Sequence, residues 1–167
     1  MNPIEQVIAL LVSNQSGVLT RVSGMFARRG FNIDSLTVGE TEHSELSRIT
    51  VTMTGEEHTL NQIVKQLGKL HDVKKLEVLE DKSTVVRELL LIKVAVKPET
   101  RQEIMDAVNV FRCKIIDFAP ESLCVEITGE SSKIDAFVDY MKPFTIIERC
   151  RTGVVALSRG SKTLKLK

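Results

Sequence analysis

Aromatic residues are scarce in this sequence, which has no tryptophan, one tyrosine and six phenylalanines among 167 residues. Proteins that bind single-stranded RNA on a β-sheet stack bases on aromatic side chains of the strands, and the apolar segment 47–53 has no aromatic residue. The formal net charge is only +1, whereas nucleic-acid binders carry a strongly basic surface. The composition therefore argues against nucleic acid as a partner.

Metal ligands and cysteine pairs are equally sparse. Cys113, Cys124 and Cys150 are odd in number and widely spaced, and the three histidines have no second ligand at i+3 or i+4. This pattern supports neither a disulfide framework nor a zinc site, so we interpret the cysteines as reduced, small apolar residues and expect no metal in this chain.

Long apolar runs and catalytic motifs are absent as well. No run approaches the ~20 apolar residues that span a bilayer, and the first residues do not have the pattern of a signal segment, so we expect a cytoplasmic protein. GxSxG, HExxH and Walker motifs do not occur, and no pair of acids converges in the pattern. We therefore expect no catalysis by this chain.

An internal repeat organises the sequence. The segments 51–56 (VTMTGE) and 125–130 (VEITGE) are 74 positions apart. The helix-spaced apolar residues that follow keep the same offset: Leu60, Ile63, Val64 and Leu67 against Ile134, Phe137, Val138 and Met141. An i, i+3, i+4, i+7 spacing predicts one buried helix face, so the chain contains two copies of one unit.

Each copy has the order strand, helix, strand, strand, helix, strand. The first copy has strands at 7–12, 33–38, 47–53 and 73–79 and helices at 18–29 and 56–70. The second has strands at 89–96, 114–118, 123–128 and 146–150 and helices at 101–110 and 131–142. This pattern predicts an α+β protein with two βαββαβ, ferredoxin-like domains. We place them at residues 1–80 and 85–167, with 81–84 as the link.

The first strand of each copy, Val7–Val12 and Leu89–Val96, is apolar over several consecutive residues. A strand with one face in water alternates between apolar and polar residues. We therefore expect the second face of each strand to be covered by another domain or subunit, and we expect a homodimer.

Only the first copy has a glycine turn before its first helix, at Asn14–Gly17. Glycine has no Cβ and lets a ligand approach the backbone, and the amides of Val18 and Leu19 at a helix N-terminus can bind a carboxylate. The alternative is an ordinary turn in which Asn14 or Ser16 caps the helix.

Asn32 follows the first helix, and its side-chain amide offers both a donor and an acceptor, which suits an amino acid. The alternative is an asparagine that adopts a left-handed turn before a strand. The basic tail after Leu157 has two interpretations as well: a solvated terminus, or a docking segment for a partner.

Several motifs together resemble one family. They are NQSGVLTRV (14–22), FARRGFNI (26–33), SLTV (35–38), LSRITV (46–51), KQLGKLHDV (65–73), REL (87–89), IKV (92–94) and GVVALSRG (153–160). In this order, over nearly the whole chain, they resemble the regulatory (small) subunit of acetohydroxyacid synthase, also called acetolactate synthase.

The resemblance implies an N-terminal ACT domain that dimerises and binds the feedback effector valine at the interface. It implies that this chain activates a separate catalytic subunit, which holds thiamine diphosphate, FAD and magnesium, and that this chain holds no cofactor. Related chains often have an acid where Ser13 stands. The family's effector-binding positions fall on Asn14, on Gly17 with the amides after it, and on Asn32 from the partner chain. Our candidate effector-binding residues are Asn14, Ser16, Gly17, Val18, Leu19, Asn32, Ile33 and Leu36.

Two other classes of function remain open at this stage. An ACT-containing sensor could bind another amino acid and act on a different enzyme or on transcription. The fold alone implies no function. An autonomous enzyme on a ferredoxin-like scaffold would therefore need a reactive cluster, and we find none in the sequence.

Overall fold

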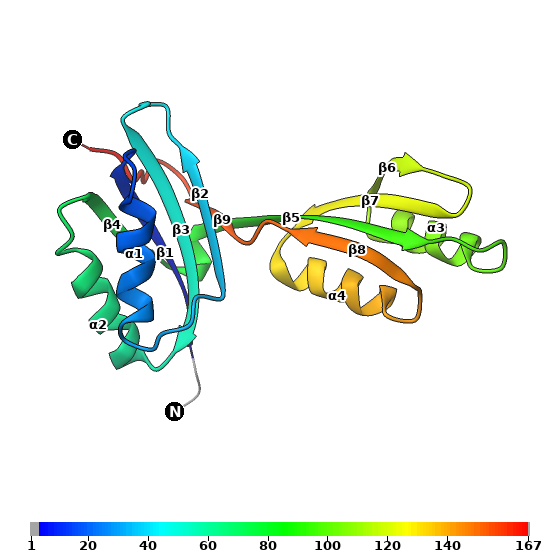
Figure 1. Cartoon of the computed structure of the whole chain (residues 1–167), viewed down its shortest axis with the longest axis horizontal. Helices are drawn as coiled ribbons and strands as arrows, with labels where there is room; N and C mark the ends of the chain where they lie inside the picture. The colour runs from blue at the N-terminus through cyan, green and yellow to red at the C-terminus, as the bar shows by residue number, and fades with distance from the viewer. Residues whose placement is uncertain (1–3, 167) are drawn as a thin grey trace. The chain divides into compact units, whose positions relative to one another are not determined.

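Two structural units, each with its own sheet, make up the computed structural model, which describes residues 4–166 (Figure 1). The first unit contains residues 4–85 and 154–166, and the second contains 86–153. The elements of the first repeat are β1 (Ile4–Ser13), α1 (Val18–Ala27), β2 (Ser35–Glu40), β3 (Leu46–Gly55), α2 (Glu57–Leu67) and β4 (Val73–Leu79).

The second repeat follows a short 3-10 turn at Asp81–Ser83. Its elements are β5 (Thr84–Ala95), α3 (Arg101–Val110), β6 (Lys114–Phe118), β7 (Ser122–Gly129), α4 (Ser131–Met141) and β8 (Ile146–Arg151). The predicted βαββαβ order of both copies is confirmed. The structure adds a strand that the sequence did not predict, β9 (Val155–Ser158), which pairs with β5.

The first strand of each repeat lies inside its sheet. The strand orders are β2-β3-β1-β4 and β6-β7-β5-β8, and the neighbouring strands are antiparallel. In matching registers, Ile8 pairs with Val51 in the first sheet and Ile92 with Val125 in the second. These central positions explain why β1 and β5 are the most apolar strands of their units.

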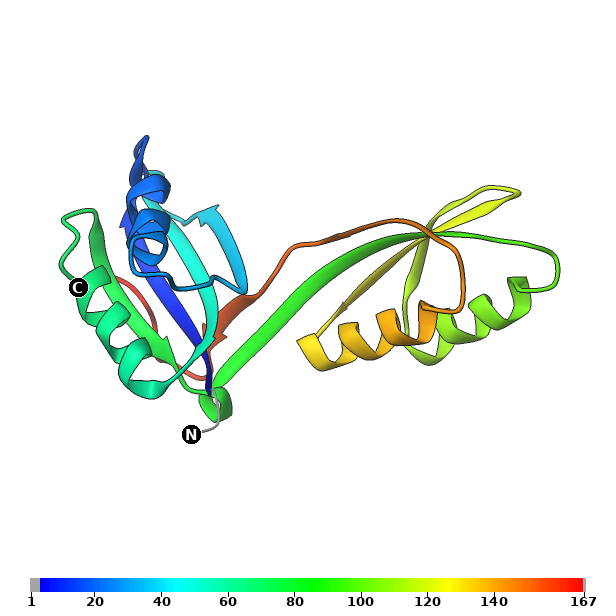
Figure 2. The ribbon, with the colours of Figure 1, turned by 60° about the horizontal axis from the view of Figure 1, so that its bottom comes forward.

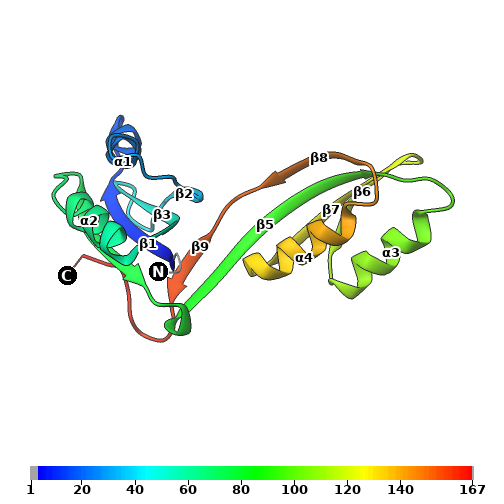
Figure 3. The same ribbon diagram turned by 90° about the horizontal axis from the view of Figure 1, so that it is seen from below.

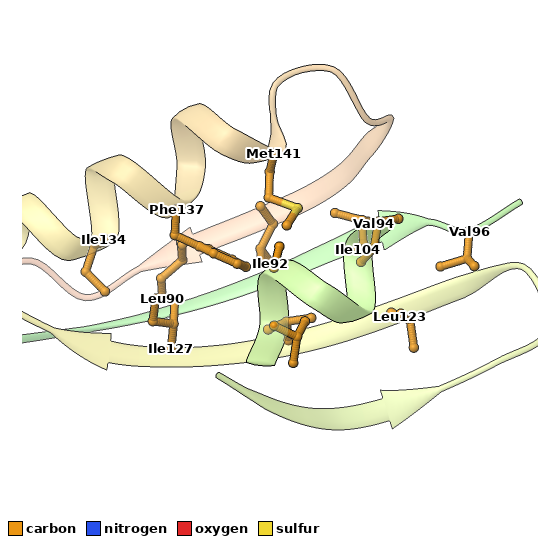
Figure 4. Close-up of a cluster of buried hydrophobic side chains, with 13 residues drawn as sticks. Leu90, Ile92, Val94, Val96, Ile104, Leu123, Ile127, Ile134, Phe137 and Met141 are labelled. Carbon is orange, nitrogen blue, oxygen red and sulfur yellow. The ribbon is translucent and has the colours of Figure 1, made fainter. Parts of the chain in front are cut away.

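Helices cover one face of each sheet. In the first unit α1 and α2 lie on one face (Figure 3), and in the second α3 and α4 lie on the same side of the strands (Figure 2). The second core contains Phe137, Met141 and Ile92 (Figure 4), and its helix residues occupy the places that Leu60, Ile63 and Leu67 hold in the first. The repeat seen in the sequence is therefore a repeat of packed cores.

The other face of the first sheet is covered by the chain's own C-terminal segment, residues 154–166, which we name the C-terminal strap. Val7, Ala9 and Leu11 point to this face and are at most 8% exposed. From the strap, Val154 and Leu164 are buried. For β1, the cover that we expected from another domain or subunit is thus provided by this segment. The sequence prediction assigns the segment to the second domain, whereas it packs in the first unit.

Polar contacts hold the strap along its length. Arg48 on β3 donates from Nη2 to the Ala156 carbonyl over 2.7 Å, and Lys75 on β4 donates from Nζ to the Lys165 carbonyl over 2.9 Å. Lys165 also forms an ion pair with Glu42 at 2.7 Å, and its hydrogen bond lowers the pKa of that carboxyl. Up to Leu166 the basic tail is therefore bound to the first sheet, and its docking to a partner stays a prediction.

No helix within residues 4–166 has the length and apolar character required to cross a membrane.

Candidate effector-binding site

The glycine turn opens α1 without a side-chain cap. Gly17 is the N-cap residue in the left-handed conformation, with φ at +82°, and neither Asn14 nor Ser16 caps the helix. The first i to i−4 bond runs from the Arg21 N–H to the Gly17 carbonyl over 3.0 Å. In the described chain the N–H groups of Leu19 and Thr20 have no acceptor. Free N–H groups at the N-terminus of a helix are a favourable place for an anion.

We expected the Val18 N–H to be available to a carboxylate, but it donates to the Gln15 carbonyl over 3.3 Å. The Val18 side chain is 3% exposed and belongs to the first core. Neighbouring Leu19 is 44% exposed. The apolar side chain available beside the turn is therefore that of Leu19.

Asn14 fixes the turn to the β2–β3 connection. Its Nδ2 donates to the Ser44 carbonyl over 2.8 Å, and its backbone N–H donates to the Glu45 carbonyl over 2.7 Å. Asn14 and Ser16 are both exposed. This bond uses one N–H of Nδ2, and the acceptor Oδ1 is the atom of the Asn14 amide that suits an ammonium group.

Arg21 and Asp72 lie beside the turn and were not found from the sequence. Arg21 Nε donates to Asp72 Oδ2 over 2.6 Å, and this bond lowers the pKa of the carboxyl. Arg21 Nη1 is 3.1 Å from the position that a Cβ on Gly17 would occupy. The separation of 51 positions in the sequence hid the pair, although Arg21 lies one helical turn after Gly17.

At the other end of α1, Asn32 is oriented by an acid. Its Nδ2 donates to Asp34 Oδ1 over 3.3 Å, and Thr54 Oγ1 donates to Asp34 Oδ2 over 2.8 Å. Among the described non-glycine residues only Arg112 has a positive φ, whereas Gly30 adopts +69°. The left-handed turn before β2 is therefore made by Gly30, and Asn32 does not adopt it.

One chain does not bring the two ends of this site together. Gly17 and Asn32 flank α1, whose ten residues span ~15 Å at 1.5 Å per residue. Asn32 is exposed, and Ile33 and Leu36, on the same segment, are half-buried against the first core. The predicted residues form two separate half-sites within a single chain.

A cavity of about 630 Å³ lies elsewhere in the first unit, between the β2–β3 connection and the strap. Leu11 and Leu164 are among its apolar lining residues, and Arg48 and Glu42 are among its charged ones. None of the eight predicted effector-binding residues lines it. Within residues 4–166, no group of three His, Cys, Asp or Glu side chains has a metal-binding arrangement.

Comparison with known proteins decides the family. Residues 8–75 match the model of the AHAS small subunit-like ACT domain, and residues 87–160 match that of the small subunit of acetolactate synthase. A relative from Methanothermobacter thermautotrophicus, named as a probable acetolactate synthase small subunit, is 48% identical over 98% of both chains. The chain belongs to the acetolactate synthase small-subunit family.

Other members of this small-subunit family agree over the full length. The acetolactate synthase small subunit of Mycobacterium bovis is 45% identical over 97% of this chain and 96% of its own. The crystal structure of the small subunit from Thermotoga maritima superposes with a TM-score of 0.88 at 42% identity, covering 95% of this chain and 99% of that one. The small-subunit fold therefore extends over both units.

Proposed function

We propose that this small subunit activates the catalytic subunit of acetolactate synthase and makes it sensitive to inhibition by valine. The observation that carries the proposal is the uncapped start of α1 at Gly17, within the part of the chain that matches the ACT domain. A helix end with free N–H groups is favourable for a carboxylate, and valine is the effector that the family resemblance implies.

In this proposal the carboxylate of valine accepts hydrogen bonds from the N–H groups of Leu19 and Thr20. The guanidinium of Arg21 lies beside the same turn and adds positive charge. The ammonium group of valine meets Asn14 Oδ1 and the Asn32–Asp34 pair, and its isopropyl group packs on Leu19 and Leu36.

The two half-sites require a second copy of the chain. β2 is an edge strand, and the exposed side chains of Val38 on β2 and Leu19 on α1 provide apolar surface for a partner. In a two-fold dimer each contact occurs twice, so Gly17 of one chain can meet Asn32 of its partner at two equivalent places. We therefore propose a homodimer through the ACT domains, with one valine at each shared site.

The chemistry of the reaction belongs to the partner in this proposal. Thiamine diphosphate, FAD and magnesium are placed in the catalytic subunit, and this chain contributes regulation without a catalytic residue. Valine can inhibit only if it binds two states of the complex with different affinity. A coupling of about 1–3 kcal/mol corresponds to a 5–150-fold change in affinity.

The test is the rate of acetolactate formation by the cognate catalytic subunit, with and without this chain, titrated with valine. We expect the chain to raise the rate and valine to reverse the increase. Activation that valine leaves unchanged would move the effector assignment to another amino acid. An unchanged rate on addition of the chain would refute the regulatory role.

A further inference from the structure

The strap begins with a residue held at both of its backbone polar groups by β2. The Val154 N–H donates to Ser35 Oγ over 3.1 Å, and Thr37 Oγ1 donates to the Val154 carbonyl over 2.6 Å. Thr52 Oγ1 on the neighbouring strand donates to the same Ser35 Oγ over 2.8 Å. Val154 is 3% exposed and Ser35 and Thr37 are half-buried, so this clamp is partly shielded from water, which would otherwise compete for its hydrogen bonds.

The residues just before the strap are also held by hydrogen bonds and ion pairs, in this case to the second unit. Arg151 is bonded through Nε to the buried carboxylate of Glu88 and through Nη1 to Asp135 at 2.6 Å. Thr152 exchanges two hydrogen bonds with Leu89, of 3.0 and 3.1 Å. Gly153, with φ at +80°, is therefore the single residue between a segment fixed to the second unit and one fixed to β2.

The clamp residues alternate along β2 with a proposed effector contact. Side chains of a strand point to opposite faces in turn. Leu36 packs against the first core, on the helix side, while Ser35 and Thr37 point to the strap. Asn32 lies three residues before Ser35. A ligand that contacts Asn32 and Leu36 and thereby shifts β2 therefore also shifts the anchor point of the strap.

We propose that the clamp of Ser35 and Thr37 on Val154 transmits effector binding from β2 to the second unit. Ser35 and Thr37 are positioning residues in this scheme and do not contact the effector. The two states are a formed and a released clamp, and valine must bind one of them more tightly for the coupling to exist. The inference rests on the proposed function, since it assigns a route for the regulation at the same site.

The test uses the full chain in complex with the catalytic subunit and compares binding with inhibition. In the double variant Ser35→Ala with Thr37→Val, both clamp hydroxyls are removed. We expect it still to bind valine, measured by calorimetry on the dimer, with an affinity that shifts at most by the preference of valine for one clamp state. The inhibitory coupling should fall about fivefold or more, which is the lower end of typical allosteric coupling.

Three single variants, Thr41→Val, Thr37→Ser and Thr37→Val, separate coupling from folding. Thr41→Val is the matched control, because within the described chain the Thr41 hydroxyl bonds only to His43 and Leu46, and this variant should keep full inhibition. Thr37→Ser retains the hydroxyl and should keep inhibition as well. If Thr37→Ser lost as much coupling as Thr37→Val, the hydrogen bond would not be the cause and the proposal would fail.

Hydrogen exchange gives a second readout, independent of enzyme activity. Valine should change the exchange of the amides at 154–158 in the wild type and leave them unchanged in the double variant. A double variant that valine inhibits as fully as the wild type would overturn the clamp while leaving the proposed function intact. A wild-type chain that does not bind valine would instead overturn the proposed function.

Discussion

Replacing Gly17 with aspartate is expected to abolish inhibition by valine while leaving activation of the catalytic subunit in place. Gly17 has φ at +82°, a conformation that costs about 1–2 kcal/mol for a residue with a side chain. A Cβ there would lie 3.1 Å from Arg21 Nη1, and the new carboxylate would compete for the amides that bind the effector. In a valine titration of the complex, the valine concentration for half-inhibition should rise by more than 150-fold, which is the upper end of typical allosteric coupling.

The matched control is Gly160→Asp. Gly160 also has a positive φ, of +71°, and a Cβ there meets no atom within 4 Å. This variant introduces the same charge and the same backbone strain in the same unit, away from α1. It should retain inhibition by valine. Equal loss of inhibition in both variants would show that strain or charge alone is responsible, and full inhibition of the Gly17 variant would exclude this helix end as the site.

A chain that ends at Gly153 is expected to lose much of the stability of the first unit. The truncation removes Val154 and Leu164, which are 3% and 8% exposed, and uncovers Val7 and Leu11. Burial of a valine or leucine side chain contributes about 1.5–3 kcal/mol, so the two strap residues alone account for about 3–6 kcal/mol. Thermal unfolding should begin at least ~10 °C lower, with aggregation through the uncovered sheet face.

A chain that ends at Leu164 is the control for this truncation. It keeps both buried anchors and loses the exposed pair of Lys165 with Glu42, and exposed ion pairs stabilise little. Its unfolding temperature should be close to that of the full chain. If both truncations unfolded like the full chain, the strap would not be part of the first unit.

The second unit and the basic tail are the candidates for docking the catalytic subunit, and the strap changes how this hypothesis is tested. A fragment that ends at Leu79 lacks the second unit and the cover of the first sheet at the same time. Loss of activation by that fragment would therefore not identify the docking surface. A fragment that joins residues 1–85 to the strap residues from Val154 onward removes the second unit alone.

The repeat could be predicted because its signal is local and occurs twice. Leu60, Ile63 and Leu67 have helical spacing, and Ile134, Phe137 and Met141 repeat it. The limits of β4, α3 and β6 agree with the structure to the residue. β9 was missed because four residues between glycines give no alternation to read, and because its partner strand is about seventy positions earlier.

The residues of the proposed site could be found from the sequence only where their signal is local. Gly17 and Asn32 stand in motifs, and the turn that each follows is visible in the sequence. The contacts that set their environment come from distant segments: Asp72 for Arg21, Ser44 for Asn14, and Thr54 for Asp34. The Val18 side chain is buried because α1 turns it toward the first core.

A mixed dimer tests the central claim, a valine site shared between two chains, most directly. One chain carries Gly17→Asp and the other Asn32→Ala, and differently tagged copies allow the mixed dimer to be purified. In a shared site, both changes fall on one site and the other is unaltered. Calorimetry should therefore find half the valine bound by the wild type, and neither variant homodimer should bind. No binding by the mixed dimer would contradict the shared site.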